Sequence, residues 1–370
     1  MINYISIENF RCFKESKFKK FSHINLIGGL NNSGKSALLE AILLLLSPQL
    51  QTIILLNKYR NEVVTKKNTF DKTWDYLFFN ANKEQSIKLT TSKSKDNNEY
   101  CLEIRKSEND QLNNVAFYER LKNSQKADIE RAIKDFELFT QKENIIHSLD
   151  LYITDQELKN DFLGSFSFTD TGRLTMLEAP EYLLNEVAYR PSKQVIAPNQ
   201  LSKLLDISVD KGFLNAIIKT IQIIDDSIID IRVVENKVLL SRDRVSYLPI
   251  GIFGDAITST LHIILTLFSL DNNSYLLIDE VENGIHHSKH LNFIQHISEI
   301  ALERNIQIFM TTHSSEFIQS FNEYSLNIDS NKFAYHELIK TRNNQIVSNL
   351  LEPEILEMKV KNSKKFRGEQ

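Results

Sequence analysis

Apolar and polar positions in the first fifty residues change from the alternation of a strand to the pattern of a helix. Residues 2–8 alternate and predict a strand, and residues 18–27 predict a second strand region. After a turn that contains glycines, strong helix formers run from Lys35 to about Leu46, without a breaker before Pro48. This part of the chain therefore predicts a strand, a loop and a helix in succession.

Alternating elements return in the second half of the chain. Its apolar pattern predicts helices at 201–224, 255–268 and 288–303, and strands at 229–234, 237–241, 275–278 and 306–310. Strands that alternate with helices favour a sheet of parallel strands joined by crossover helices. A last hairpin is expected at 332–342 and 345–350, and the charged residues from Lys359 onward are expected to fray.

Between these two parts the chain is polar and rich in Lys, Asn, Asp and Ser. It predicts strands at 86–91 and 99–105 and a charged helix at 126–141. Apolar positions recur throughout, and no heptad pattern is sustained that would indicate a long coiled-coil arm. We therefore expect a discontinuous head domain of residues 1–60 and 183–350, an inserted lobe of residues 61–182 without an assigned function, and a C-terminal tail of residues 351–370.

Composition narrows the class of protein. Hydrophobic residues make up 42% and charged residues 25% of the 370 residues, which permits a large buried core. The two cysteines, Cys12 and Cys101, are too few for a disulfide framework and indicate a reducing compartment. The most apolar run, residues 37–46, is too short to span a bilayer, and the N-terminus lacks a signal core. We expect a cytoplasmic protein without a membrane partner.

Charge gives less guidance. The formal net charge is −4, so bulk charge does not support nucleic-acid binding. A local basic patch stays compatible with such binding. The basic clusters 17–20, 58–60 and 66–67 are candidates, but solvated surface charges explain them better.

A phosphate-binding loop occupies residues 29–36. Its sequence, Gly-Leu-Asn-Asn-Ser-Gly-Lys-Ser, fits the pattern G-x-x-x-x-G-K-[ST] at every fixed position. Glycines let the backbone present several amide donors to phosphate oxygens, and the following helix adds its positive N-terminal end. The predicted nucleotide-binding residues are Gly29, Asn31, Asn32, Ser33, Gly34, Lys35, Ser36 and Ala37, with ATP and Mg²⁺ as ligands. A chance match in a glycine-rich turn is disfavoured by the strand before the loop and the helix after it.

Two residues of this loop have assigned chemistry. Lys35 supplies a point charge to the β- and γ-phosphates, and Ser36 supplies a hydroxyl ligand to Mg²⁺.

An apolar strand ends in two carboxylates in the sequence Ser-Tyr-Leu-Leu-Ile-Asp-Glu, residues 274–280. Such a strand delivers acids to the carboxyl edge of a parallel sheet. Asp279 is the expected Mg²⁺ ligand, and Glu280 is expected to orient or deprotonate the attacking water. A core strand that meets an acidic loop by chance is the alternative.

His313 follows the next apolar strand, and the right-handed crossover rule places it on the same sheet edge as Asp279. A neutral imidazole there could donate a hydrogen bond to the γ-phosphate or hold the water. A purely structural histidine is the alternative.

Four segments together resemble a known family. They are Ile-Glu-Asn-Phe-Arg-Cys-Phe at residues 7–13, the phosphate loop, the Leu-Leu-Ile-Asp-Glu strand and Thr-Thr-His-Ser at residues 311–314. They resemble ABC-class ATPases related to SMC, RecF and OLD proteins, most of all the OLD-type heads of bacterial anti-phage systems. The likeness covers about residues 1–50 and 185–320. It implies an α/β P-loop NTPase fold of the ABC-ATPase type, with a mixed sheet and an inserted α+β lobe.

The resemblance also implies roles for single residues. Arg11 would lie near the nucleotide, and Glu282, Asn283 and His286 would lie near a dimer interface. The glutamine that often helps to hold Mg²⁺ in this family has a candidate in Gln194, which a surface loop explains at least as well.

The family's signature segment is expected before the acidic strand, where Gly254 and Asp255 open a helix. Asp255 is a good N-cap, and Gly254 allows close approach of backbone. In such ATPases this helix end meets the γ-phosphate held by the other subunit, so ATP is buried between two heads. The chain departs from the family at Ala256, where relatives often have glycine, and at His287, where proline is common. A simply capped helix is therefore the alternative.

The nuclease domain that many OLD proteins carry has no counterpart. Asp329 is isolated after His313, without the Asp-x-Asp pair that such a nuclease needs. No Cys and His spacing indicates a zinc site. We expect that this chain cuts nothing itself.

Three functions follow for testing. The first is an ATPase module of a bacterial anti-phage defence or toxin-control system, dimeric or larger, which controls a separately encoded effector such as a nuclease. Its turnover should be slow, because it acts as a switch. The second is a RecF-like DNA-binding repair or maintenance ATPase. The third is a nucleotide-binding scaffold without turnover, against which Glu280 argues.

Overall fold

The computed structural model describes residues 1–60, 74–92, 99–106, 145–154, 161–169, 174–178, 186–192 and 198–361. The chain forms two compact units: Met1 with residues 18–43 and 185–370, and residues 2–17 with 44–184. The domain division drawn from the sequence instead assigned 2–17 and 44–60 to the head, and as a division into functional domains it stays a prediction. The expected helix at 126–141 lies outside the described residues.

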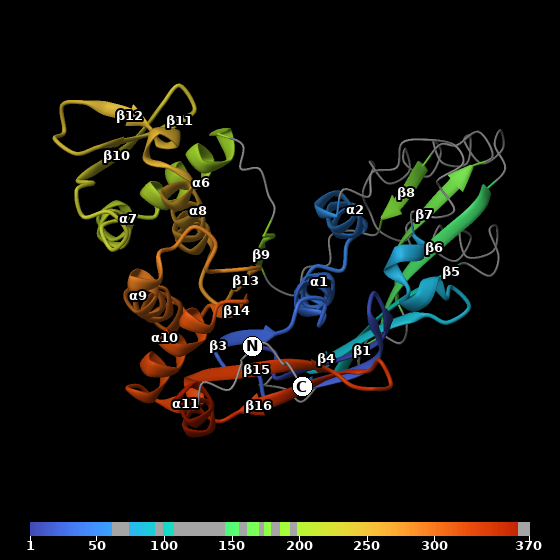
Figure 1. The fold of residues 1–370 in the computed structure, drawn as a ribbon. Helices are drawn as coiled ribbons and strands as arrows, with labels where there is room; N and C mark the ends of the chain where they lie inside the picture. The colour runs from blue at the N-terminus through green and yellow to red at the C-terminus, as the bar shows by residue number, and fades with distance from the viewer. Residues whose placement is uncertain are drawn as a thin grey trace. The chain divides into compact units, whose positions relative to one another are not determined.

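The first unit is built on a six-stranded mixed sheet (Figure 1). Its strands, in spatial order, are β16 (Ile346–Leu351), β15 (Phe333–Lys340), β3 (Ile24–Gly29), β14 (Gln307–Thr311), β13 (Tyr275–Ile278) and β9 (Val187–Arg190). Neighbouring strands from β15 to β9 pair in parallel, and β16 is antiparallel to β15. The predicted parallel strands and last hairpin are confirmed.

Burial explains why these strands lie in the middle of the sheet. Every residue of β13 and β14 is buried, and β3 is buried up to its last glycine. Such continuous burial is typical of parallel strands covered on both faces. Helices α9 (His290–Glu303) and α10 (Ser315–Leu326) lie beside these strands in Figure 1 and share one apolar core with them. The phosphate loop leads from β3 into α1 (Lys35–Leu46).

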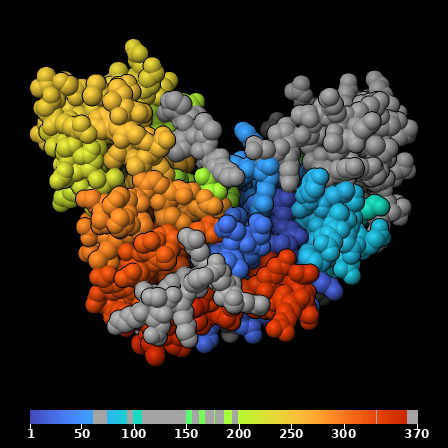
Figure 2. Space-filling view, in the orientation of Figure 1, coloured from blue at the N-terminus to red at the C-terminus, as the bar shows by residue number. Residues whose placement is uncertain are grey.

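A second apolar core of the same unit packs three helices on a small sheet. The helices are α6 (Pro198–Asp210), α7 (Leu214–Ile221) and α8 (Asp255–Ser269), and the strands are β10 (Asp230–Val234), β11 (Lys237–Ser241) and β12 (Tyr247–Pro249). The single helix expected at 201–224 is wrong, because the chain turns at Gly212 with φ +83° and begins a new helix. The small sheet belongs to the yellow region of Figure 2, where Val245 is 83% exposed.

The second unit contains a seven-stranded sheet. Its strands, in spatial order, are β2 (Phe13–Lys19), β1 (Tyr4–Phe10), β4 (Ile87–Ser92), β5 (Glu99–Lys106), β6 (Ile145–Thr154), β7 (Asp161–Thr169) and β8 (Leu174–Glu178). From β1 to β8 each neighbouring pair is antiparallel. The strand region expected at 18–27 is wrong, because Lys20 adopts φ 62° and separates β2 from β3.

The remaining described elements are short. They are α2 (Leu50–Tyr59), α11 (Pro353–Lys361) and 3₁₀ helices at Asp75–Leu77, Phe79–Ala81, Ile250–Phe253, His287–Lys289 and Ser330–Lys332. Fraying from Lys359 onward is wrong for the start of the tail, because Lys359 lies in α11 and its amine is 2.6 Å from both carboxylate oxygens of Glu337. Within the described ranges, none of the helices is both long and apolar enough to cross a bilayer.

Candidate nucleotide site

The carboxyl ends of four parallel strands meet at one edge of the six-stranded sheet. Backbone bonds continue the pairing past the strand ends: the Asp279 amide donates to the Arg190 carbonyl at 2.9 Å and the Thr312 amide to Ile27 at 3.1 Å. The phosphate loop, the two carboxylates and His313 therefore leave the sheet side by side. The predicted common edge for Asp279 and His313 is confirmed by the parallel pairing of β13 with β14.

The phosphate loop adopts a conformation that depends on glycine. Gly29 has φ +136°, and a Cβ there would lie 2.5 Å from the Leu338 carbonyl oxygen. Gly34 has φ 93° and Asn32 has φ 60°. The chain then enters α1, whose first amides have no acceptor within the helix. These amides and the helix end form a binding place for phosphate oxygens.

The predicted loop residues differ in exposure. Asn31 and Asn32 are exposed, whereas Ser33 and Ala37 are buried. The Ser33 hydroxyl lies beside Gly29, 2.9 Å from the position that a Cβ of that glycine would occupy.

The Lys35 amine is folded back onto its own loop. It donates to the carbonyl oxygens of Gly29 at 2.9 Å and Leu30 at 2.8 Å, and it lies 3.3 Å from Nδ1 of His313. Only 5% of the residue is exposed. Burial lowers the pKa of Lys35 to about 8, although the carboxylates of Asp279 and Glu280 oppose this shift.

Ser36 and Asp279 form the candidate magnesium site. The Ser36 hydroxyl lies 3.0 Å from Oδ1 and 2.9 Å from Oδ2 of Asp279, and Thr311 donates to Oδ1 at 2.6 Å. Mg²⁺ prefers oxygen ligands and is usually held by one or two protein groups together with phosphates and water. The pair fits this mode. Among the described residues, no cluster of three or more His, Cys, Asp or Glu side chains could hold a metal.

His313 lies between the amine and the second carboxylate. Because the Lys35 ammonium donates to Nδ1, a neutral His313 carries its proton on Nε2, which is 4.0 Å from Oε1 of Glu280. Burial lowers the pKa of His313, and the charge of Lys35 adds to the effect. The backbone amide of His313 donates to Oε1 of Glu282 at 2.7 Å. The imidazole is thus neutral at pH 7, as the sequence-based hypothesis required.

Glu280 is held in an uncommon backbone conformation. Its φ is 51°, in the left-handed region that residues other than glycine rarely occupy. Its amide donates to the Thr311 hydroxyl at 2.9 Å, and Oε2 accepts from the Asn283 amide group at 2.8 Å. Strained backbone of this kind is common at catalytic positions.

Two contributors escaped the sequence analysis. Thr311 connects Asp279 to the Glu280 amide, and Arg190 is 7% exposed at the end of β9. Burial lowers the pKa of Arg190 to about 10, opposed by the nearby charge of Asp279. The only signal in the sequence was an arginine that ends an apolar strand. Its neighbour in the sheet could not be known without the fold.

The predicted signature segment begins α8. The cap residue is Gly254, with φ 90° and ψ 169°, and no side chain caps the helix. The expected N-cap role of Asp255 is therefore wrong, since Asp255 is already the first helical residue. Within the chain a Cβ at Gly254 would meet nothing within 4 Å, and close approach of a nucleotide held by a second head stays a prediction. A close approach within the chain occurs at Gly284, where a Cβ would lie 3.1 Å from Cα of Ala256.

For the remaining predicted residues the structure gives only local contacts or no description. Arg11 belongs to the second unit, where its amide donates to Leu77 at 2.7 Å and its Nη1 to the Tyr76 carbonyl at 3.1 Å. Its place near the nucleotide stays a prediction. Gln194 and the basic pair at 66–67 lie outside the described residues. His286 is exposed beside the Ser288 hydroxyl, at 2.9 Å, and its role at an interface stays a prediction.

Comparisons with known proteins give one family match and two relatives. Residues 24–319 match the family described as "AAA domain, putative AbiEii toxin, Type IV TA system". The chain is 27% identical over 337 residues to a Helicobacter pylori protein named ATP/GTP phosphatase, covering 87% of this chain and 88% of that protein. It is 34% identical over 90 residues to the uncharacterized protein MJECL10 of Methanocaldococcus jannaschii, covering 24% of this chain and 41% of that protein.

Two solved structures of SMC heads also align with the chain. The SMC head domain from Thermotoga maritima gives a TM-score of 0.43 at 10% identity, over 95% of this chain and 98% of that chain. An SmcHead bound to the C-winged helix domain of ScpA gives 0.47 at 13% identity, with the same coverage of 95% and 98%.

Proposed function

The chain belongs to the AAA domain family described as putative AbiEii toxin, Type IV TA system, and from this premise we propose that it binds ATP with Mg²⁺ and hydrolyses it to ADP and phosphate. One observation carries the proposal. The Ser36 hydroxyl lies within 3.0 Å of both carboxylate oxygens of Asp279, and the Lys35 amine beside it contacts His313. These three distant segments of the chain would serve as phosphate loop, metal-binding acid and γ-phosphate sensor.

Binding of the triphosphate exchanges partners of Lys35. Its amine now donates to the Gly29 and Leu30 carbonyls, and β- and γ-phosphate oxygens would accept in their place. The amides at the start of α1 add further donors. Asp279 and Ser36 would hold Mg²⁺, which supplies neutralisation of the phosphate charge when bound.

Hydrolysis is proposed as in-line attack of water on the γ-phosphorus. The new P–O bond forms as the bond to the β-phosphate oxygen breaks, the water proton passes to the Glu280 carboxylate, and ADP leaves. His313 would donate its Nε2 proton in a hydrogen bond to a γ-phosphate oxygen. Glu280 is now held by Asn283 at 2.8 Å, and it must turn toward the water to act.

Glu280→Gln tests the reaction. The amide keeps the shape and the contacts of the side chain but cannot accept the proton. ATP turnover should fall about 100-fold or more, while ATP binding is retained. Glu235→Gln is the matched control, since Glu235 is an exposed glutamate with φ 49° in the turn between β10 and β11. Absence of turnover in the native chain, together with intact ATP binding, would favour the scaffold function instead.

The biological role is proposed from the family. We place the chain in a defence or toxin-control system, where two heads close around ATP and regulate a separately encoded effector, such as a nuclease. The Gly254–Asp255 end of α8 would face the γ-phosphate bound by the other head. Light scattering of the Glu280→Gln variant should give a dimer with ATP and a monomer without it. Asp255→Arg should prevent the dimer, and a monomer under all conditions in both variants would exclude this arrangement.

A further inference from the structure

Arg190 is a buried arginine whose partners are only partly accounted for. It ends β9 beside Asp279, and its guanidinium group donates from Nη2 to the Ser259 hydroxyl. Its Nη1 is buried and has no hydrogen-bond partner among the described residues. A buried donor without a partner costs about 1–3 kcal/mol, so such a group calls for an explanation.

The contacts of Ser259 lead back to the candidate catalytic carboxylate. Because it accepts from Arg190, the Ser259 hydroxyl points its own proton at the carbonyl oxygen of Asn283, 3.0 Å away. The side-chain amide of Asn283 in turn donates to Oε2 of Glu280 at 2.8 Å. One link therefore runs from Arg190 through Ser259 of α8 to the backbone of Asn283, and a second runs from the Asn283 side chain to Glu280, so the residue Asn283 joins the two.

Close packing makes this connection between α8 and Glu280 stiff. Gly284 follows Asn283 with φ +84°, and a Cβ there would lie 3.1 Å from Cα of Ala256 and 3.4 Å from Cβ of Ser259. The loop that carries Glu280 and Asn283 therefore rests on the first turn of α8 without space for a side chain between them. A displacement of α8 must move this loop with it.

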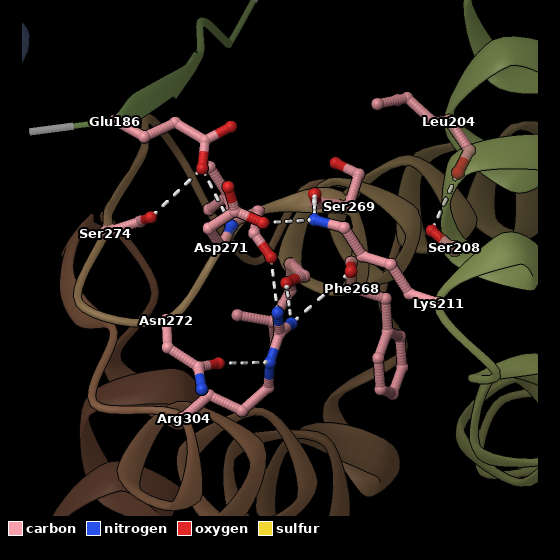
Figure 3. A network of polar contacts seen from close by, with 12 residues as sticks. Glu186, Leu204, Ser208, Lys211, Phe268, Ser269, Asp271, Asn272, Ser274 and Arg304 are labelled. Atoms are coloured by element: carbon pink, nitrogen blue, oxygen red, sulfur yellow. Dashed lines mark hydrogen bonds and ion pairs between the residues drawn. The ribbon is translucent and has the colours of Figure 1, made fainter.

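The far end of α8 is bound by Arg304, which follows α9, and the turn after α8 is bound by Glu186 (Figure 3). Arg304 donates to the Leu267 carbonyl at 2.8 Å and to Asn272 at 3.3 Å. Glu186, just before β9, accepts from the Asp271 amide at 2.7 Å and from Ser274 at 3.1 Å. Strand β9 is thus tied to α8 at both ends, by Glu186 through the following turn and by Arg190 through Ser259.

We propose that Arg190 is a positioning residue of the hydrolytic site, which orients Glu280 through Ser259 and Asn283 and so couples that carboxylate to the position of α8. The Ser259 bond sets the position of the loop that carries Asn283 and Glu280. The proposal rests on the proposed ATP hydrolysis, and its test must separate the two.

Arg190→Met and Ser259→Ala test the coupling, with Arg304→Met as the matched control for loss of a buried arginine bound to α8. Arg190→Met should lower kcat for ATP at least tenfold and change ATP affinity less than threefold. Ser259→Ala should lower kcat by a similar factor, and the double variant should be no worse than Arg190→Met, because both lie on one path. Arg304→Met should lower Tm and, measured well below that temperature, should lower kcat much less than Arg190→Met, because Arg304 holds only the far end of α8.

Amide hydrogen exchange provides a readout that needs no turnover. In the nucleotide-free protein, the Asn283 backbone amide donates to the Glu280 backbone carbonyl at 3.1 Å, and the Ile285 amide donates to the Glu282 carbonyl at 2.9 Å. Both site variants should speed exchange of these amides, whereas Arg304→Met should speed exchange around residues 267–273 instead. If the native chain does not hydrolyse ATP but exchange changes in this way, the proposed function fails and the coupling stands. Equal kcat in native and Ser259→Ala proteins, with unchanged exchange at 283–285, would overturn the proposal even if Arg190→Met does not fold.

Discussion

The affinity for ATP should fall as the pH rises through about 8, because Lys35 must be protonated to bind the triphosphate. In the free protein only 5% of Lys35 is exposed, and burial lowers its pKa to about 8. Four negative charges on ATP replace the neutral carbonyl acceptors, so in the complex the pKa of Lys35 returns to its ordinary value or higher. A pKa that is lower in the free than in the bound state means that binding takes up a proton above pH 8.

The magnitude follows from the protonated fraction of the free protein. With a pKa of about 8, this fraction falls from about 0.9 at pH 7 to about 0.1 at pH 9, and the affinity falls about tenfold. Other groups contribute little in this range. The pKa of His313 is lowered, so its imidazole stays neutral above pH 7, and the phosphates of ATP have already lost their protons.

Titration with a fluorescent ATP analogue at pH 7, 8 and 9, at constant ionic strength, measures the effect. Lys35→Met is the control, because it leaves a side chain of similar length that does not titrate. This variant should bind weakly, with the same affinity at all three pH values. A flat profile in the native protein, or an equal slope in Lys35→Met, would refute the reasoning.

Four other variants test separate parts of the structure. Ser36→Ala removes the hydroxyl 2.9 Å from Asp279, so ATP affinity in Mg²⁺ should fall about tenfold, with a smaller change in EDTA, by the same titration. Gly284→Ala should lower the free energy of unfolding by about 2–3 kcal/mol in urea, since strain at φ +84° adds to a contact with the first turn of α8. Gly212→Ala, with φ +83° and nothing within 4 Å, should cost only about 1 kcal/mol, and equal costs would exclude the contact as the cause. Arg304→Met should lower the free energy of unfolding by about 2–3 kcal/mol, because the carbonyls at the end of α8 lose their buried donor; an unchanged urea midpoint would contradict this.

Local patterns were sufficient for the chemistry of the candidate site. The glycines and the Lys-Ser pair of the phosphate loop lie within eight residues of chain, so their spacing alone predicted the loop. Apolar runs predicted β13 and β14 and their crossover helix, and the handedness rule then gave the common edge for Asp279 and His313.

Errors arose where one residue changes the direction of the backbone. Gly212 divides a continuous helical pattern into α6 and α7, and Lys20 ends β2 by adopting φ 62°. The N-cap of α8 is Gly254 instead of the expected Asp255 for a similar reason. Gly254 adopts φ 90°, so the helix begins at Asp255, one residue earlier than an Asp255 cap implies. Propensity averages over several residues and misses such single positions.

The sequence by itself determined which groups are expected to meet the phosphates, because a phosphate loop and the acid end of a strand are local structures with fixed residue types. Only the tertiary structure decided what surrounds them. Arg190, Ser259 and Gly284 come from three separate segments, and no spacing between them carries a signal. Their contacts exist because β9 pairs with β13 while α8 packs beside the loop after β13, and such long-range pairing is invisible to local sequence patterns.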